Sequence, residues 1–184
     1  MWCIDLAQSV EATKTKKLDP EFRREILKIP GADKILLCFQ CGTCTADCPI
    51  SRFSDFYRPR KMAHMVQLGL KDRLLLDKNI WLCTTCYTCI DNCPQGVEIA
   101  TLVRILRNLS VKYANTMPLV YRELAENLMK TGLVYVIPQS RIRRREQRGL
   151  PPLPKTKSEE VSKILEMTEL TKIIESLQTF EKVE

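Results

Sequence analysis

Eight of the nine cysteines fall into two copies of one spacing. In each copy two residues separate the first three cysteines, three residues precede the fourth, and a proline follows. The copies are Cys38, Cys41, Cys44, Cys48 with Pro49 and, 45 residues later, Cys83, Cys86, Cys89, Cys93 with Pro94. Three thiolates at this spacing can hold three corners of one cubane cluster from a single loop. The spacing therefore predicts two [4Fe–4S] clusters.

The fourth cysteine of each motif lies beyond the loop, and the proline after it prevents a helix from continuing through its own nitrogen. In two-cluster ferredoxins with this run, the fourth cysteine binds the other cluster. We therefore expect two ligand sets: Cys38, Cys41, Cys44 and Cys93 for one cluster, and Cys83, Cys86, Cys89 and Cys48 for the other. This exchange brings the motifs face to face and keeps the clusters close, as an electron relay requires.

Zinc, disulfides and plain buried thiols are the alternatives. A structural zinc site usually takes two C-x2-C pairs separated by a longer loop, whereas each motif here has three cysteines in close succession. The N-terminus lacks a secretory signal, no run approaches the roughly 18 apolar residues of a membrane span, and disulfides are rare in the cytoplasm. We therefore expect a cytoplasmic iron–sulfur protein without a membrane span. Cys3, outside both motifs, is interpreted as a bystander.

The positive charge of the chain is concentrated in one segment. The 184 residues carry a net charge of +7, of which residues 141–157 contribute +6. A nucleic-acid-binding fold would need a broad basic face, so we expect no nucleic acid partner. The segment Arg141–Arg148 is interpreted either as a docking site for an acidic partner or as a solvated linker.

Helical signals dominate the rest of the chain. Prolines at a first helical position and glycines after a last turn mark several helix ends. Residues Ile99, Leu102, Val103, Leu106 and Leu109 form an apolar stripe of helical period. The expected helices are 20–29, 59–68, 74–82, 97–113, 118–130 with Gly132 as cap, and one from Ser158 with an apolar stripe from Val161 to Leu177.

These patterns predict an all-α protein: an alpha-helical ferredoxin domain with two clusters, plus a helical C-terminal extension. The expected divisions are an N-terminal extension (1–19), the ferredoxin domain (20–115), a helical extension (116–137), a basic proline-rich linker (138–157) and a C-terminal amphipathic helix (158–184). Because a proline-rich linker separates that last helix from the ferredoxin domain, we favour a partner protein as the cover of its stripe.

The cysteine motifs stand in a context that resembles a known family. The features are Cys38–Pro49 followed by Arg58-Pro-Arg and Gly69-Leu, then Trp81-Leu-Cys-Thr-Thr-Cys-Tyr-Thr-Cys, Cys93–Ile99 and Arg107-Asn-Leu. Over roughly residues 30–115 they resemble the C subunit of CoB–CoM heterodisulfide reductase from methanogenic archaea. The cysteine motifs alone also occur in iron–sulfur subunits of quinone-linked dehydrogenases of the succinate/fumarate, glycerol-3-phosphate or lactate type, which is the alternative function.

The resemblance implies a place in a larger oxidoreductase. In that family a flavin-containing A subunit passes electrons to the C subunit, which passes them to a catalytic B subunit that reduces the mixed disulfide of coenzymes M and B in methanogenesis. The complex associates with a hydrogenase or a formate dehydrogenase and couples this reaction to ferredoxin reduction by flavin-based electron bifurcation. This chain would then be an electron-transfer subunit.

No substrate chemistry is expected on this chain. It has neither a G-x-G-x-x-G fingerprint nor the adjacent Cys-Cys pair of the catalytic B subunit, and no nucleophile–base pair is visible. The single histidine, His64, is interpreted as a packed or surface residue. Trp81, beside Cys83, is interpreted equally as a shield of a cluster or as core. Gly42 has Tyr87 as its counterpart in the second motif, so glycine is not required there.

Overall fold

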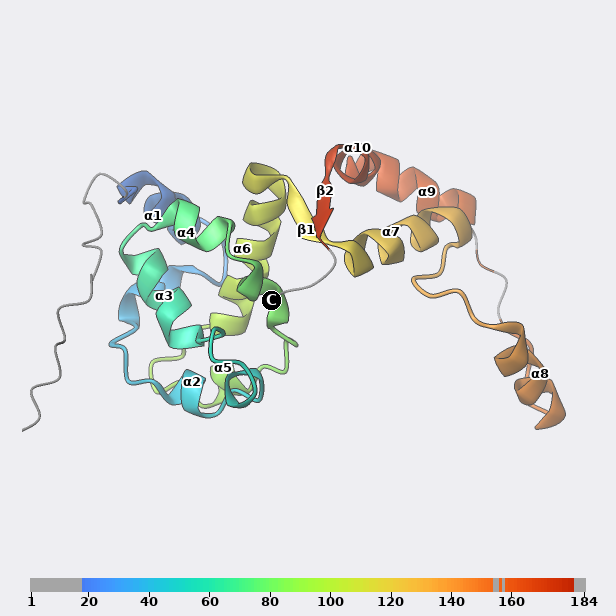
Figure 1. The fold of residues 1–184 in the computed structure, drawn as a ribbon, viewed down its shortest axis with the longest axis horizontal. Helices are drawn as coiled ribbons and strands as arrows, with labels where there is room; N and C mark the ends of the chain where they lie inside the picture. Colours follow the sequence, from blue (N-terminus) through green and yellow to red (C-terminus); the bar gives the residue numbers. More distant parts are fainter. Residues whose placement is uncertain (1–17, 154–155, 157, 181–184) are drawn as a thin grey trace, which may run out of the picture. The chain divides into compact units, whose positions relative to one another are not determined.

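The computed structural model describes residues 18–153, 156 and 158–180 (Figure 1). The chain divides into two compact units, one ending at Leu109 and one beginning at Ser110. The described residues are almost entirely helical, with two strands of three residues each. Cys3 and most of the expected N-terminal extension lie outside the described residues. None of the helices described is long and apolar enough to cross a membrane.

The first unit begins with helix α1 (Pro20–Leu27). Asp19 caps this helix, because its carboxylate accepts hydrogen bonds from the N–H groups of Glu21 and Phe22, and Pro20 fits the first helical position. Phe22 and Ile26 point into the core. The helix ends two residues earlier than the sequence predicts.

The first cysteine motif lies between a 3₁₀ helix (Asp33–Leu37) and α3 (Pro59–Gln67). The short helix α2 (Thr43–Ala46) follows the cysteine loop, and a 3₁₀ turn (Ile50–Arg52) comes before α3. Proline starts α3 as expected. Two elements replace the single helix predicted over 74–82: α4 (Lys71–Leu75) and a 3₁₀ helix (Lys78–Leu82). Asp77 separates them, because its carboxylate caps the second element at Asn79.

The second motif repeats this order. The 3₁₀ helix Lys78–Leu82 precedes its cysteine loop, α5 (Thr88–Asp91) follows, and α6 (Ile99–Ala114) ends the arrangement. The elements up to the fourth cysteine lie 45 residues after their counterparts, whereas α6 starts 40 residues after α3. The first half (33–67) thus has five more residues than the second half (78–107) between its fourth cysteine and the following helix.

The core of this unit is built mainly on α3 and α6. The predicted stripe on α6 is buried in full, from Ile99 to Leu109. Met62 and Val66 of α3 join it. Ile35 and Ile80, which occupy equivalent places in the two 3₁₀ helices, are both buried. Each half therefore anchors its cysteine loop to one shared core.

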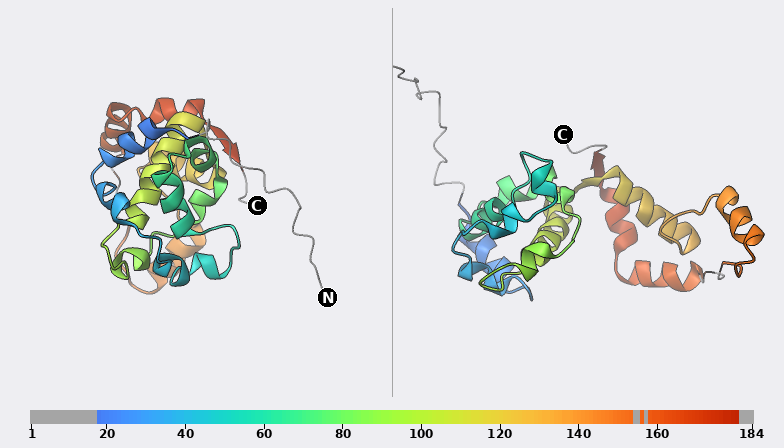
Figure 2. Two further views of the ribbon diagram at one scale, coloured as in Figure 1. Left: turned by 90° about the vertical axis from the view of Figure 1, so that its left-hand side faces the viewer. Right: turned by 90° about the horizontal axis from the view of Figure 1, so that it is seen from below.

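The second unit contains a parallel pair of short strands, β1 (Thr116–Pro118) and β2 (Gln178–Phe180), with Thr116 opposite Gln178. Between them lie α7 (Leu119–Thr131), α8 (Gln139–Gln147), α9 (Ser158–Met167) and α10 (Leu170–Ser176). Gly132 ends α7 in a left-handed conformation, as predicted. Figure 2 shows α7 and α9 side by side, and their residues are in contact.

Three expectations about this unit are wrong. The segment expected to be a linker contains helix α8, because arginine and glutamine are good helix formers even between prolines. The single C-terminal helix is instead two, since Glu169 adopts a left-handed conformation between α9 and α10. Leu165, Ile174 and Leu177 are buried within the chain itself, where we expected a partner. Ile164, also in the stripe, stays 59% exposed.

Candidate iron–sulfur centres

The eight motif cysteines line two cavities of the first unit, four to each. The first cavity is lined by Cys38, Cys41, Cys44 and Cys93. The second cavity is lined by Cys83, Cys86, Cys89 and Cys48. In each case the fourth cysteine comes from the other motif. Four thiols around one cavity are the donor set that a [4Fe–4S] cluster takes, so the residues present fit this cofactor.

In both loops the middle cysteine is more exposed to solvent than the third. The middle cysteines, Cys41 and Cys86, are exposed, while Cys44 is buried and Cys89 half-buried. Hydrogen bonds from Thr43 and Thr88, respectively, lower the pKa of Cys41 and of Cys86. Loss of solvent raises the pKa of Cys44 to about 11 and that of Cys89 to about 12, and neighbouring sulfurs add to the effect. Iron binds thiolates, so cluster assembly must release these protons and is favoured as pH rises.

The cavities adjoin each other. Cys44 of the first motif is close enough to Cys89 of the second to raise its pKa. Helices α2 and α5, which follow the two loops, are in contact (Figure 1). Between them Asn92 Nδ2 donates to Asp47 Oδ2 over 2.8 Å, and these two residues occupy equivalent places in the halves. Contact between equivalent residues is what a local two-fold relation produces.

Both loops bend through the same backbone conformation. Gln40 and Gly42 have positive φ values of 64° and 91°, and their equivalents Thr85 and Tyr87 have 52° and 64°. The left-handed conformation is therefore required at four positions, of which glycine occupies one. Glycine is not required in the second loop, as expected, because Tyr87 adopts the same left-handed conformation against the preference of its side chain.

The carbonyl groups at the entrance of each loop are held by one long side chain from the following helix. Gln67 of α3 donates to Ile35 O at 3.1 Å and to Cys38 O at 2.9 Å. Arg107 of α6 donates to the equivalent carbonyls, Ile80 O at 3.0 Å and Cys83 O at 2.6 Å. Sequence reasoning missed Gln67 and did not assign this role to Arg107. The signal that could have found them is their equal spacing from the starts of the two helices.

Polar hydrogens also point at the thiols. Gln40 Nε2 donates to Cys38 Sγ and Thr85 N to Cys83 Sγ, both over 3.4 Å, and Val97 N donates to Cys93 Sγ over 3.2 Å. Hydrogen bonds to sulfur are among the factors that set the reduction potential of a cluster. Gln40 and Thr85 are equivalent, so one half uses a side chain where the other uses its backbone.

The remaining residues singled out from the sequence lie as follows. His64 is exposed on α3. Trp81 is half-buried, and the guanidinium of Arg107 lies over its ring with its carbon 5.5 Å from the ring centroid. Trp81 packs against the core and is not among the residues that line either cavity, which favours the core interpretation. The arginines of the segment Arg141–Arg148 lie on α8, in the second unit.

Comparison with known proteins agrees with this geometry. The family model of a 4Fe–4S dicluster domain matches residues 34–97, a range that contains both motifs. The chain is 37% identical over 163 residues to the C subunit of an H2:CoB-CoM heterodisulfide,ferredoxin reductase from Methanothermobacter marburgensis, which covers 85% of this chain and 86% of that protein.

This chain belongs to the family of heterodisulfide reductase C subunits. Its similarity to other members extends well beyond the cysteine motifs. The iron–sulfur C subunit of the CoB–CoM heterodisulfide reductase from Methanopyrus kandleri is 34% identical over 174 residues, covering 88% of this chain and 90% of that one. The C subunit of a ferredoxin:CoB-CoM heterodisulfide reductase from Methanosarcina mazei is 35% identical over 134 residues, covering 72% and 80%. The predicted family and the two [4Fe–4S] clusters are thus confirmed.

Proposed function

We propose that this heterodisulfide reductase C subunit is a non-catalytic electron relay. It receives electrons from a flavin-containing A subunit and delivers them to a catalytic B subunit, which reduces the heterodisulfide of coenzymes M and B. A [4Fe–4S] cluster, when bound, takes up and releases one electron at a time. The observation that carries this proposal is the pair of adjoining four-cysteine cavities.

The chain's own residues prepare those cavities for electron transfer. Gln67 and Arg107 fix the loop entrances, so the thiols change position little when the charge on a cluster changes. Exposed Cys41 and Cys86 bring one side of each cavity to the surface, where a partner can approach. Buried Cys44 and half-buried Cys89 lie where the cavities adjoin. An electron can therefore enter at one surface and leave at the other.

The proposed ligand sets follow the linings of the cavities. Cys38, Cys41, Cys44 and Cys93 hold the first cluster, and Cys83, Cys86, Cys89 and Cys48 hold the second. The adjoining α2 and α5 support this exchange, because they bring each fourth cysteine to the opposite loop.

Exposed aromatic side chains support a partner on the first unit. Phe53 is 92% exposed and Phe56 68%, both in the longer connection of the first half. Phe39, directly after Cys38, is 60% exposed. Aromatic residues are enriched in interfaces, and large exposed ones point to protein association. We propose that these residues contact neighbouring subunits of the complex, in the cytoplasm.

Anaerobic purification of the chain with its native partners tests the relay. We expect about eight iron atoms per chain, from two four-iron clusters, a cubane-type EPR signal on reduction, and co-purifying flavin and cysteine-rich subunits. Zinc in place of iron would refute the cluster sites. A quinone-binding membrane subunit in place of the flavin and cysteine-rich subunits would favour the quinone-linked dehydrogenase class, which the family membership does not.

The ligand exchange has a direct test. Cys93→Ser should damage the cluster held by the first motif, and Cys48→Ser should damage the one held by the second. Each variant should lose up to half of its iron, while the remaining cluster keeps its EPR signal. Cys38→Ser and Cys83→Ser serve as references that identify the two signals. If Cys93→Ser instead spoils the signal that Cys83→Ser spoils, each motif holds its own cluster.

A further inference from the structure

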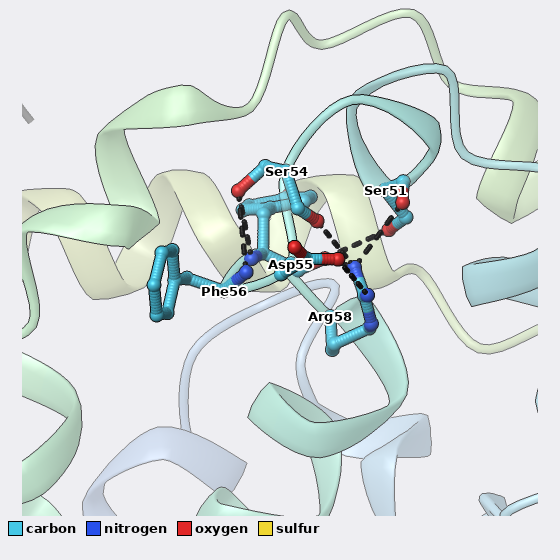
Figure 3. Close-up of polar contacts among 6 residues, drawn as sticks. Ser51, Ser54, Asp55, Phe56 and Arg58 are labelled. Atoms are coloured by element: carbon cyan, nitrogen blue, oxygen red, sulfur yellow. Dashed lines mark hydrogen bonds and ion pairs between the residues drawn. The ribbon is translucent and has the colours of Figure 1, made fainter. Parts of the chain in front are cut away.

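In the first half, the longer connection between Cys48 and α3 contains a hydrogen-bonded turn, residues 51–58, which we call the clasp (Figure 3). The guanidinium of Arg58 donates to the carbonyl oxygens of Ser51 at 3.2 Å, of Tyr57 at 3.0 Å, and of Ser54. Asp55 lies 3.6 Å from the same guanidinium. Three carbonyl groups of one turn thus share a single cation, which gives the turn a defined shape without regular secondary structure.

The clasp fixes the backbone of Tyr57 on both sides. Its carbonyl oxygen accepts from Ser51 Oγ at 2.9 Å as well as from Arg58, and its N–H donates to Ser54 Oγ at 3.2 Å. The side chain is only 2% exposed. A tyrosine held by its backbone and buried along its ring has its hydroxyl placed by the fold.

That hydroxyl belongs to the second cavity. Tyr57 lines it together with Cys48, Cys83 and Cys89. Its side chain is buried among these sulfurs, with Cys83 as the hydrogen-bonding neighbour. A phenol hydroxyl carries one proton, which it can donate to a sulfur.

The first cavity differs at the equivalent position. Counting 40 residues on, as from α3 to α6, Tyr57 corresponds to Val97, which lines the first cavity. Val97 donates its backbone N–H to Cys93 Sγ. Tyr57 cannot repeat this bond to Cys48, because its N–H is taken by Ser54. Gln40 Nε2 and Thr85 N serve the two cavities at one pair of equivalent positions. At the next pair, the first cavity has the backbone amide of Val97, whereas the second has the buried side chain of Tyr57.

We propose that Tyr57 is a positioning residue that raises the reduction potential of the second cluster by directing its hydroxyl to Cys83 Sγ, and that the Arg58 clasp holds it there. The two clusters of this chain are then unequal. This inference rests on the ligand sets proposed above. Reduction adds negative charge to a cluster, so a donor to its sulfur stabilises the reduced form. The phenolic proton stays on Tyr57 throughout.

Tyr57→Phe in the full chain, purified anaerobically, tests the proposal because it keeps the ring and removes the hydroxyl. Potentials are measured by EPR-monitored redox titration, with Cys83→Ser identifying the signal of the second cluster. We expect that cluster to become harder to reduce by up to tenfold, about 59 mV for one electron, while the first keeps its potential. Iron content should stay at the wild-type level.

Tyr135→Phe is the matched control. Tyr135 lies in the second unit, outside both cysteine cavities, and its ring is exposed at the surface. We expect no shift in either potential. An equal shift in this variant, or none in Tyr57→Phe, overturns the role of Tyr57 while the iron content still upholds the cluster sites.

A spectroscopic measurement detects the Tyr57 hydrogen bond directly, even if the shift in reduction potential is small. In D2O, the Tyr57 hydroxyl should contribute an exchangeable deuteron coupled to the reduced second cluster, visible by ENDOR and absent in Tyr57→Phe. Arg58→Met should weaken the same coupling, because the clasp loses its cation. A coupling unchanged in Tyr57→Phe would overturn the proposal. A change confined to the signal identified by Cys38→Ser would refute the ligand sets instead.

Discussion

The first half of the cluster unit (33–67) and the second half (78–107) share a backbone but few side chains. Each has a 3₁₀ helix, a loop with left-handed bends at the same two places, a short helix and a long one. The side chains that stabilise this backbone differ: Gln67 in one half does what Arg107 does in the other. The repeated backbone positions the cysteines, and the differing side chains give each cavity its own surroundings.

The halves differ most in how their long helices end. Helix α3 stops at Gln67, and Gly69 follows with φ +70°, packed against the backbone of Asp19. The equivalent residue on α6, Leu109, lies inside a helix that runs on to Ala114. Only the first half therefore needs a glycine at this place.

We expect Gly69→Ala to have the largest effect, lowering the free energy of unfolding by about 3 kcal/mol. The left-handed backbone costs about 1–2 kcal/mol with a side chain, and contact of the new methyl with the Asp19 carbonyl adds about 1–3. The measurement is the urea midpoint, followed anaerobically through cluster absorbance. Gly96→Ala is the control, because Gly96 lies in the same unit with a similar positive φ but has only Lys34 Nζ near it, at 4.0 Å. Equal losses in both variants would exclude the contact as the cause.

The carbonyl-holding side chains provide the second test. Arg107→Leu should cost about 2 kcal/mol and Gln67→Leu about 1, because hydrogen bonds from a charged donor contribute more than those from a neutral one. Both midpoints are measured by the same urea titration. In addition, the Arg107 variant should loosen the second motif selectively, so its cluster should be lost first on exposure to a chelator. A larger loss in the Gln67 variant would contradict the proposed equivalence.

A smaller effect is expected at the bends of the loops. Gly42→Ala should cost about 1 kcal/mol from backbone strain alone, since a Cβ there meets Arg60 only at 3.7 Å. Tyr87→Gly should change stability by less than about 0.5 kcal/mol, because relief of strain offsets the added freedom of the unfolded chain. Thermal midpoints of the two variants, compared under the same anaerobic conditions, measure the difference. A clear loss in Tyr87→Gly would show that the tyrosine ring stabilises the loop.

The smallest effect is expected at the contact between equivalent residues. Asn92→Asp places a second carboxylate against Asp47 on an exposed surface, so we expect a loss of about 0.5 kcal/mol at neutral pH. The loss should shrink with added salt, because salt screens the repulsion between exposed charges. Asn92→Ala should lose the hydrogen bond without this salt dependence. A salt-independent loss in Asn92→Asp would argue against charge repulsion.

The parts of the fold that could be predicted are those that a local pattern determines. Pro59 predicts the start of α3, and the apolar stripe predicts helix α6, and both signals lie in a short stretch of sequence. The cysteine spacing predicts which thiols belong to one cavity, because a cluster in such a protein takes three cysteines from one motif and the fourth from the other. The grouping around each cavity matches that prediction, and the ligand sets themselves await the cysteine variants.

The parts that could not be predicted depend on contacts far along the chain. Gln67 holds carbonyl groups 29 and 32 residues earlier, and its only mark in the sequence is a spacing from the start of α3 equal to that of Arg107 in α6. Tyr87 takes a left-handed bend because the loop demands it, against the local preference. The segment Arg141–Arg148 fitted either a docking site for an acidic partner or a solvated linker, and its arginines lie on helix α8, which the sequence did not predict. For Gln67, the deciding partners lie outside the window that a sequence pattern covers.

The hydrogen bond between Asn92 and Asp47 has a consequence for how chains recognise one another while they fold. In a protein built from two similar halves, the first half of one chain could pair wrongly with the first half of a neighbouring chain. That pairing would bring two Asp47 carboxylates together, whereas the correct one joins a carboxylate to an amide. A single difference between aspartate and asparagine thus favours pairing of unlike halves and penalises one wrong assembly.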